Sequence, residues 1–171
     1  MINVPIIETQ NLRMRAPSAA DFDIDLEFFN SDRCLAFDEK RDADRTFDTL
    51  CFHMGHWAFR GFGLWAVEHK DDHTYYGRVG LVQMPSWDLP ELGWVLTKPM
   101  AEGKGIAFEA AVAVRDYAFS TLDMPKLQST IRVGNERSIK LAKRLCATYD
   151  RTEEFPKHGQ CEVYIHQRSA A

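Results

Sequence analysis

The sequence lacks the features that mark several large classes of protein. Its 21 basic residues form no Lys- or Arg-rich block and are outnumbered by 25 acidic residues, which argues against nucleic acid as the main ligand. The cysteines form no C-x-x-C pair, and their wide spacing is unlike a zinc knuckle or a dense disulfide framework: they are Cys34, Cys51, Cys146 and Cys161. These absences leave a small molecule as the expected partner and give no reason to expect a metal.

Long hydrophobic runs are also missing. The first twenty residues contain no apolar segment after a basic start, so we expect no signal peptide. The longest apolar stretch, from Gly105 to Leu122, is interrupted by Glu109, Arg115 and Asp116, which indicates a buried helix rather than a membrane span. We therefore predict a cytoplasmic protein with reduced thiols and no membrane contact.

What is present is the composition of one ordinary domain. The chain has 171 residues, of which 45% are hydrophobic and 27% are charged, so it can bury a core. No repeat or linker divides it, and we treat residues 1–171 as a single domain. Hydrophobic periodicity predicts the element order β-α-α-β-β-β-α-β-α-β-β. This order favours an α/β (α+β) fold with a mixed central sheet of about six to seven strands and helices on both faces.

Two of the expected elements have distinctive details. The amphipathic helix between about Asp44 and Arg60 is expected to bury a stripe made of Phe47, Leu50, Cys51, Met54 and Ala58. The strand from Glu91 to Thr97 contains Gly93, and a glycine inside a strand indicates a bulge or a close backbone approach.

A glycine loop precedes the long apolar helix. Gly103-Lys104-Gly105 allows the backbone to approach a ligand, and the helix start that follows favours an anion, so a phosphate or pyrophosphate could bind there with Lys104 at the rim. A strand-to-helix turn without a ligand is the alternative. A Walker loop is excluded because Lys98 stands where its first glycine is needed, and a dinucleotide fingerprint because Phe108 stands where its third glycine is needed.

This loop resembles a motif of a known family. The segment Glu102-Gly-Lys-Gly-Ile-Ala-Phe-Glu-Ala110 is similar to the pyrophosphate-binding motif Gln/Arg-x-x-Gly-x-Gly/Ala of the GNAT acetyltransferases. It is most similar to the branch that acetylates ribosomal-protein N-termini, where Gly-x-Gly-aromatic-Ala-x-Glu-Ala is typical. The opening from Ile7 to Arg15 resembles the first strand of that branch, and Asn135-x-x-Ser138 matches a further motif. The resemblance covers nearly the whole chain.

The chain departs from the family pattern in three places. Met100 replaces the usual Gln or Arg, which removes a side-chain contact but leaves the backbone amides. Ile106 replaces a common aromatic residue. Cys146-Ala147 stands where Gly-Phe usually ends a helix, which leaves open both the local turn and the position of the following strand.

The resemblance implies that an amine attacks the thioester of acetyl-CoA directly. The cofactor would lie between the strands that end at Thr97 and Val133, with pantetheine along the first strand, pyrophosphate on the loop amides, and an amide near Leu96 polarising the carbonyl. The expected cofactor contacts are Val95, Leu96, Thr97, Glu102, Gly103, Lys104, Gly105, Ile106, Ala107, Asn135 and Ser138.

Three residues are candidates for the proton transfers that this reaction needs. Glu91 is the candidate base, acting through a water, although a solvated glutamate at a strand end is an equal alternative. By resemblance, Ser138 would donate to the leaving thiolate, and a helix-capping serine is its alternative. Tyr149 is the second choice for that role, with an ordinary core or surface tyrosine as its alternative.

The acceptor side is less defined by the sequence. By resemblance, the helix at about 44–60 borders it, so His53, His56 and Trp57 are expected in the wall of the substrate pocket. Trp87 and Trp94 are further candidates to line an aromatic pocket, with a place in the core as the equal alternative for Trp94. A metal site at Cys51-x-His53-x-x-His56 is disfavoured because Cys51 and His53 face different sides of a helix.

The resemblance leaves the identity of the acceptor open. It could be a protein N-terminus or a small amine. The alternative function is a non-catalytic acyl-CoA-binding sensor or accessory module, which the loss of Gln or Arg at Met100 favours and the Asn135 and Ser138 pair disfavours. An α/β domain without any CoA is the remaining alternative. A homodimer is compatible with the habit of the family.

Overall fold

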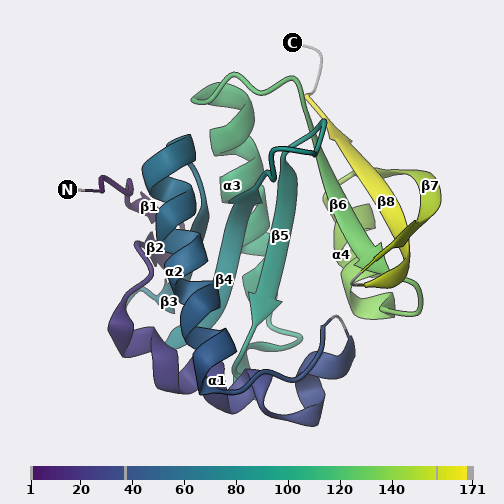
Figure 1. Ribbon diagram of the computed structural model, residues 1–171. Coiled ribbons are helices and arrows are strands. Elements are labelled where there is room, and N and C mark those ends of the chain that lie inside the picture. Colours follow the sequence, from purple (N-terminus) through teal and green to yellow (C-terminus); the bar gives the residue numbers. More distant parts are fainter. Residues whose placement is uncertain (1, 37, 157, 169–171) are drawn as a thin grey trace.

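A computed structural model describes residues 2–36, 38–156 and 158–168. Eight strands form one sheet in the order β1-β2-β3-β4-β5-β6-β8-β7, in which β5 and β6 are parallel and all other neighbours are antiparallel (Figure 1). The strands are β1 (Ile7–Glu8), β2 (Leu12–Arg15), β3 (Leu64–His69), β4 (Tyr75–Val82), β5 (Glu91–Leu96), β6 (Lys126–Arg132), β7 (Thr148–Phe155) and β8 (Gly159–Gln167). The mixed α/β fold is confirmed. The strand beyond the expected seven is β1, whose two residues are too few to show a period.

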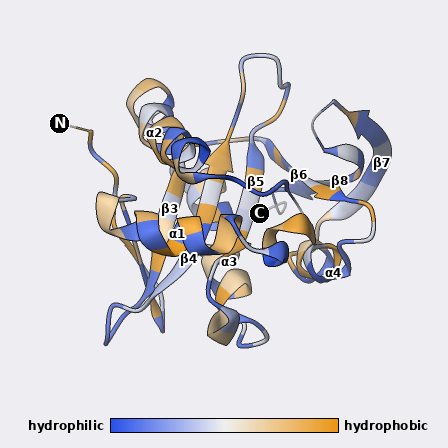
Figure 2. Ribbon diagram, turned by 60° about the horizontal axis from the view of Figure 1, so that its bottom comes forward, coloured by the Kyte–Doolittle hydropathy of each residue, from blue (hydrophilic) through white to orange (hydrophobic). Residues whose placement is uncertain are grey.

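Helices lie on both faces of the sheet, as expected. They are α1 (Phe22–Phe29), α2 (Ala43–Arg60), α3 (Ile106–Ser120) and α4 (Glu136–Arg144). The pair α1 and α2 lies on one side, and α3 with α4 lies on the other (Figures 1 and 2). None of the helices in the described residues is long and apolar enough to cross a membrane.

The main core lies between the sheet and α3. The inward face of this helix consists of small residues, Ala110, Ala111, Val114 and Ala118, all fully buried. Small side chains let the helix axis approach the sheet closely, where larger residues such as Trp65 and Leu92 fill the layer from the strands. By contrast, the outer strand β7 is largely hydrophilic and exposed (Figure 2).

The expected apolar stripe of α2 is confirmed at Leu50, is half-buried at Met54, and is wrong at its other three positions. The buried residues are Thr46, Leu50, His53, His56 and Trp57, whereas Phe47, Cys51 and Ala58 are exposed. Polar anchors determine which face points inward. The His56 ring bonds the Phe62 carbonyl through Nδ1 at 2.7 Å and accepts from the Gln83 amide at Nε2, and Trp57 Nε1 donates to the Leu64 carbonyl at 3.0 Å. Hydropathy alone does not register such anchors.

The end of α4 has the turn that Gly-Phe would have given, a point that the sequence left open. Cys146 adopts a left-handed conformation, with φ of 62°, at the position where glycine is preferred. Its amide donates to the Lys143 carbonyl, and the Ala147 amide donates to the Ala142 carbonyl, both at 3.0 Å. These two bonds form a Schellman motif, so β7 begins at the place that a glycine would have given it.

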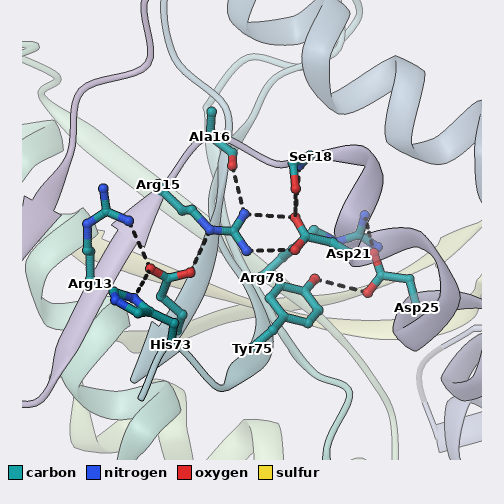
Figure 3. A network of polar contacts seen from close by, with 10 residues as sticks. Arg13, Arg15, Ala16, Ser18, Asp21, Asp25, His73, Tyr75 and Arg78 are labelled. Carbon is teal, nitrogen blue, oxygen red and sulfur yellow. Dashed lines mark hydrogen bonds and ion pairs between the residues drawn. The ribbon is translucent and has the colours of Figure 1, made fainter. Parts of the chain in front are cut away.

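A network of buried charges joins the N-terminal segment to the sheet (Figure 3). Arg15 pairs with Asp21 at 2.7 Å and with Glu68 at 2.6 Å, and this bonding raises the pKa of Arg15 against the effect of burial. Beside it, the Asp25 carboxylate contacts Arg78 at 3.2 Å and accepts a hydrogen bond from Tyr75. The network connects β2, β3, β4 and α1, and thereby fixes the position of α1 at one end of the sheet.

Candidate active site

The parallel strands β5 and β6 separate almost as soon as they meet. Their pairing is limited to Glu91 opposite Gln128. The bulge that Gly93 suggested does not occur, since β5 stays in continuous register with β4 and the irregularity lies instead between Val67 and Glu68. A Cβ built on Gly93 would meet no atom within 4 Å, so this glycine faces open space.

Side chains replace the backbone bonds lost where the strands part. The Ser129 hydroxyl donates to the Leu92 carbonyl at 2.7 Å, on the edge of β5 that β6 has left. Its oxygen lies 2.9 Å from His166 Nε2. Since the single Ser129 proton goes to the carbonyl, His166 donates at this contact. Burial lowers the pKa of His166 to about 4, so the ring is neutral at pH 7. The parting of β5 and β6 is therefore held in place by hydrogen bonds of these side chains.

Between the separated strands lies a cleft of about 740 Å³. It extends from the end of β5 that begins at Glu91 to the glycine loop and the start of α4. The residues expected in the site that line it are Glu91, Val95, Leu96, Glu102, Gly103, Gly105, Ile106, Ala107, Asn135, Ser138 and Trp87. The structure therefore brings together in one cavity residues from four separate segments of the chain.

The backbone groups that face the cleft belong to alternate residues of β5. The Leu92 carbonyl points toward β6, while the Thr97 amide donates to Tyr76 of β4 at 2.8 Å. Because the peptide groups of successive strand residues alternate between the two edges, those of Trp94 and Leu96 face the cleft. The Val95 groups face β4, and Thr97 is buried, with its carbonyl accepting from Arg33.

The glycine loop places a helix start at one end of the cleft. Gly103 and Gly105 have φ of 74° and 82°, which glycine adopts without strain. Gly105 is the N-cap of α3 and offers no side-chain acceptor, so the first amides of the helix keep their hydrogen-bonding capacity for a ligand. With the helix dipole, these amides form an anion-binding site.

Cations surround that helix start. Glu102 lies between Arg33, at 2.7 Å, and Arg137, so two guanidinium groups hold the loop carboxylate and balance its negative charge. Burial opposes ionisation, but the bonds to both arginines lower the pKa of Glu102. The cationic side chains lining the cleft are Arg33, Arg132, Arg137, Lys140 and Arg144. The site therefore suits a ligand with several negative charges.

The other end of the cleft contains a carboxyl group with an unusual acidity. Burial raises the pKa of Glu91 to about 7, although the Thr130 hydroxyl partly counteracts it. By strand alternation Glu91 lies on the same face of β5 as Gly93 and Val95, the side where Val95 packs against Phe28 of α1. A carboxyl that titrates near neutrality can accept a proton at pH 7 and above.

The start of α4 completes the wall of the cleft. The Asn135 Oδ1 atom accepts from the Ser138 amide at 3.2 Å, so Asn135 is the N-cap of the helix, as the sequence predicted. The Ser138 hydroxyl accepts a hydrogen bond from Trp94 Nε1 at 3.2 Å. This hydroxyl faces the cleft from the side of the sheet that carries α3 and α4.

Several residues expected in the site lie elsewhere. Tyr149 is on β7 with its hydroxyl near Thr152, and Lys104 lines a second hollow beside Thr9 and Glu109. Of the expected pocket wall on α2, His53, His56 and Trp57 are buried outside the lining of the cleft. In the described residues, no cluster of three or more His, Cys, Asp or Glu side chains is placed to bind a metal.

The sequence analysis left Trp94 between the pocket and the core, and it missed most of the cations; Trp94 lines the cleft. Arg137, Lys140 and Arg144 follow one another at intervals of three and four, so the sequence did hold a signal that they share one face of α4. Arg33 gave no such signal, because it reaches the glycine loop only through the tertiary fold.

Comparison with known proteins agrees with this architecture. The sequence model of the acetyltransferase (GNAT) domain matches residues 11–148, most of the chain. The chain belongs to the GNAT acetyltransferase family. A crystal structure of an acetyltransferase from Agrobacterium tumefaciens str. C58 is 31% identical and has a TM-score of 0.89, covering 97% of this chain and 96% of that one.

Two further proteins are similar to this chain, one over part of its sequence and one in its fold. The uncharacterized protein YkkB of Bacillus subtilis (strain 168) is 32% identical over 94 residues, which are 54% of this chain and 54% of YkkB, so the match spans about half the length of that relative. The fold is also that of RimL, a ribosomal L7/L12 α-N-protein acetyltransferase in complex with coenzyme A. That structure has a TM-score of 0.78 at 15% identity and covers 95% of this chain and 98% of its own.

Proposed function

We propose that this GNAT domain transfers the acetyl group of acetyl-CoA to a primary amine by direct attack on the thioester. The observation that carries the proposal is the cleft itself. It joins an uncapped helix start ringed by cations to a carboxyl group with a pKa of about 7. One end of the cleft thereby offers an anion site for the phosphates of the cofactor, and the other end offers a carboxylate that can accept the proton of the amine.

The cofactor is supported by the backbone of β5 and the start of α3. The peptide groups of Trp94 and Leu96 would pair with pantetheine as an added strand. The amides after Gly105 would bind the pyrophosphate. The side-chain amide NH2 of Asn135 would contact pantetheine from the other wall of the cleft. The Trp94 amide, which lies beside Gly93, would polarise the thioester carbonyl, because the Leu96 amide lies about 7 Å further along the strand. The Gly93 position leaves room for the acetyl group.

The two faces of the sheet would separate the group that accepts a proton from the amine and the group that stabilises the leaving sulfur. Glu91 lies on the α1 side and would remove a proton from the amine through a water. Ser138 lies on the α4 side and would stabilise the departing thiolate. The amine would then approach one face of the thioester carbonyl from the Glu91 side, and the sulfur would depart from the tetrahedral intermediate near Ser138.

The acidity of Glu91 favours an acceptor amine of low basicity. An α-amine has a pKa near ~7.7–8.0 and a lysine amine near ~10.4, and each pKa unit corresponds to about 1.4 kcal/mol in proton transfer. A base with a pKa of about 7 is therefore well matched to an α-amine. We propose a protein N-terminus or a small α-amine as the acceptor. RimL, a ribosomal L7/L12 α-N-protein acetyltransferase, has the same fold.

Release of free thiol from acetyl-CoA tests this function. The purified chain is incubated with acetyl-CoA and a panel of peptides that have free or acetylated N-termini. The panel also includes small primary amines, some of which are α-amines and some of which are not. We expect thiol release and a mass gain of one acetyl group for free α-amines, and neither for blocked peptides. Acetyl-CoA binding without thiol release on any amine would favour the alternative of a non-catalytic acyl-CoA-binding module.

The oligomeric state is a separate matter, and the homodimer expected from the resemblance stays a prediction.

A further inference from the structure

We propose that Trp94 is a positioning residue that orients the Ser138 hydroxyl toward the leaving sulfur. The inference rests on the proposed acetyl transfer and assigns a role to a side chain that the sequence analysis left between the pocket and the core. Its basis is the hydrogen bond of 3.2 Å from the indole Nε1 of Trp94 on β5 to Oγ of Ser138 on α4.

The hydrogen-bonding capacity of the two groups determines the orientation. An indole nitrogen can only donate, whereas a serine hydroxyl has one proton and two lone pairs. Trp94 therefore occupies a lone pair of Ser138 and leaves the hydroxyl proton for another acceptor. Within the described part of the chain, the Ser138 hydroxyl has no acceptor for that proton. The proton is thus available to a group bound in the cleft.

Packing holds the indole in place for this purpose. Trp94 is only partly buried, and it packs against both hydrophobic clusters that border the cleft. One cluster lies under β4, β5 and α3, and the other under β6, β8 and α4. The ring thus spans the gap between the separated halves of the sheet, so its rotamer is fixed by contacts on both sides. A fixed donor places Ser138 Oγ more accurately than a serine on a helix start could place itself.

In the proposed step, each electron pair and each proton has a defined destination. The amine nitrogen forms a bond with the thioester carbon, the C–S bond breaks, and its electron pair goes to sulfur. Ser138 remains protonated and donates a hydrogen bond to this thiolate. A thiol is far more acidic than an alcohol, with a pKa of about 8.5 for that of cysteine, so full proton transfer from serine is unnecessary. The proton that the amine gives up to Glu91 passes to solvent, and solvent supplies the proton that completes the free thiol. Trp94 acts only through Ser138.

A double-mutant cycle tests the coupling. Trp94→Phe keeps an aromatic ring in the gap and removes the donor, and we expect a fall in kcat of about 5- to 10-fold, the effect of one neutral hydrogen bond, with the Kd for acetyl-CoA within twofold of the wild-type value. Ser138→Ala removes the donor to the thiolate, and we expect a loss of about 100-fold. In the Ser138→Ala background, Trp94→Phe should have no further effect on kcat.

Trp65→Phe is the matched control. The Trp65 indole also donates, to the Pro5 carbonyl at 2.7 Å, but it lies in the main core and does not line the cleft. Its loss should lower stability and leave kcat unchanged. Equal losses from Trp94→Phe with and without Ser138 would show a structural role and overturn the inference alone. A wild-type chain without turnover on any amine would overturn the proposed function, and the inference with it.

Discussion

Glu91→Gln is expected to lower kcat/KM by about 10²- to 10⁴-fold, the contribution of a well-placed general base. Because burial raises the pKa of Glu91 to about 7, wild-type kcat/KM should rise with pH through about 7 and then through the pKa of the amine. The variant should lack the first rise and keep only the later one from the amine itself. A kcat/KM profile from pH 5.5 to 9 measures both.

The same substitution should stabilise the folded protein at alkaline pH. The folded pKa of Glu91 is raised, so its contribution to stability is fully present below the unfolded value of 4.5 and is lost as pH rises through about 7. The unfolding free energy of wild type should therefore fall relative to Glu91→Gln by up to about 3 kcal/mol between pH 4.5 and 8. The control is Glu154→Gln, exposed on β7, which should change neither profile. An unchanged rate and pH profile in Glu91→Gln would remove Glu91 from the mechanism.

Gly93→Val is expected to reduce turnover at least about 100-fold while the protein stays folded. A side chain at this position meets no protein atom within 4 Å, and the Gly93 backbone is not in the left-handed region, so the strand itself tolerates the change. The added carbons would instead occupy the space proposed for the acetyl group, and a displacement of about 1 Å at a reacting centre can cost about 100-fold. Steady-state kinetics and thermal unfolding measure the two expectations separately.

Two variants calibrate this result. Gly93→Ala adds a single carbon and should fall between the wild type and Gly93→Val in activity. Gly80→Ala is the structural contrast, because its Cβ would lie 2.2 Å from the Gly63 carbonyl oxygen. It should lower the melting temperature, which Gly93→Val should not. A Gly93→Val protein with wild-type turnover would mean that the acetyl group lies elsewhere.

Local patterns in the sequence were sufficient to predict most elements of this fold. The strand, glycine loop and helix from Glu91 to Ser120 follow from turn chemistry and periodicity, and the Asn135 cap follows from residue type and position. Those features depend on neighbours in the chain. The class of the fold follows from their order.

Features that depend on distant contacts were not predictable in the same way. The bond from Ser129 to the Leu92 carbonyl and the burial that shifts the pKa of Glu91 join segments about forty residues apart. The inward face of α2 is determined by hydrogen bonds of His56 and Trp57, which periodicity of hydrophobic residues does not count. The turn at Cys146 was also open from the sequence, because a cysteine stands where glycine is usual, and the left-handed conformation is nevertheless kept.

Calorimetric titration of acetyl-CoA into the wild-type protein tests the central claim most directly. With an anion site at the start of α3, five lining cations and open space at Gly93, we expect one site per chain with a micromolar Kd. Gly93→Val titrated in parallel should bind more weakly, because the acetyl end would no longer fit. No heat of binding at physiological salt, in a protein shown to be folded, would contradict the assignment of this cleft to acetyl-CoA.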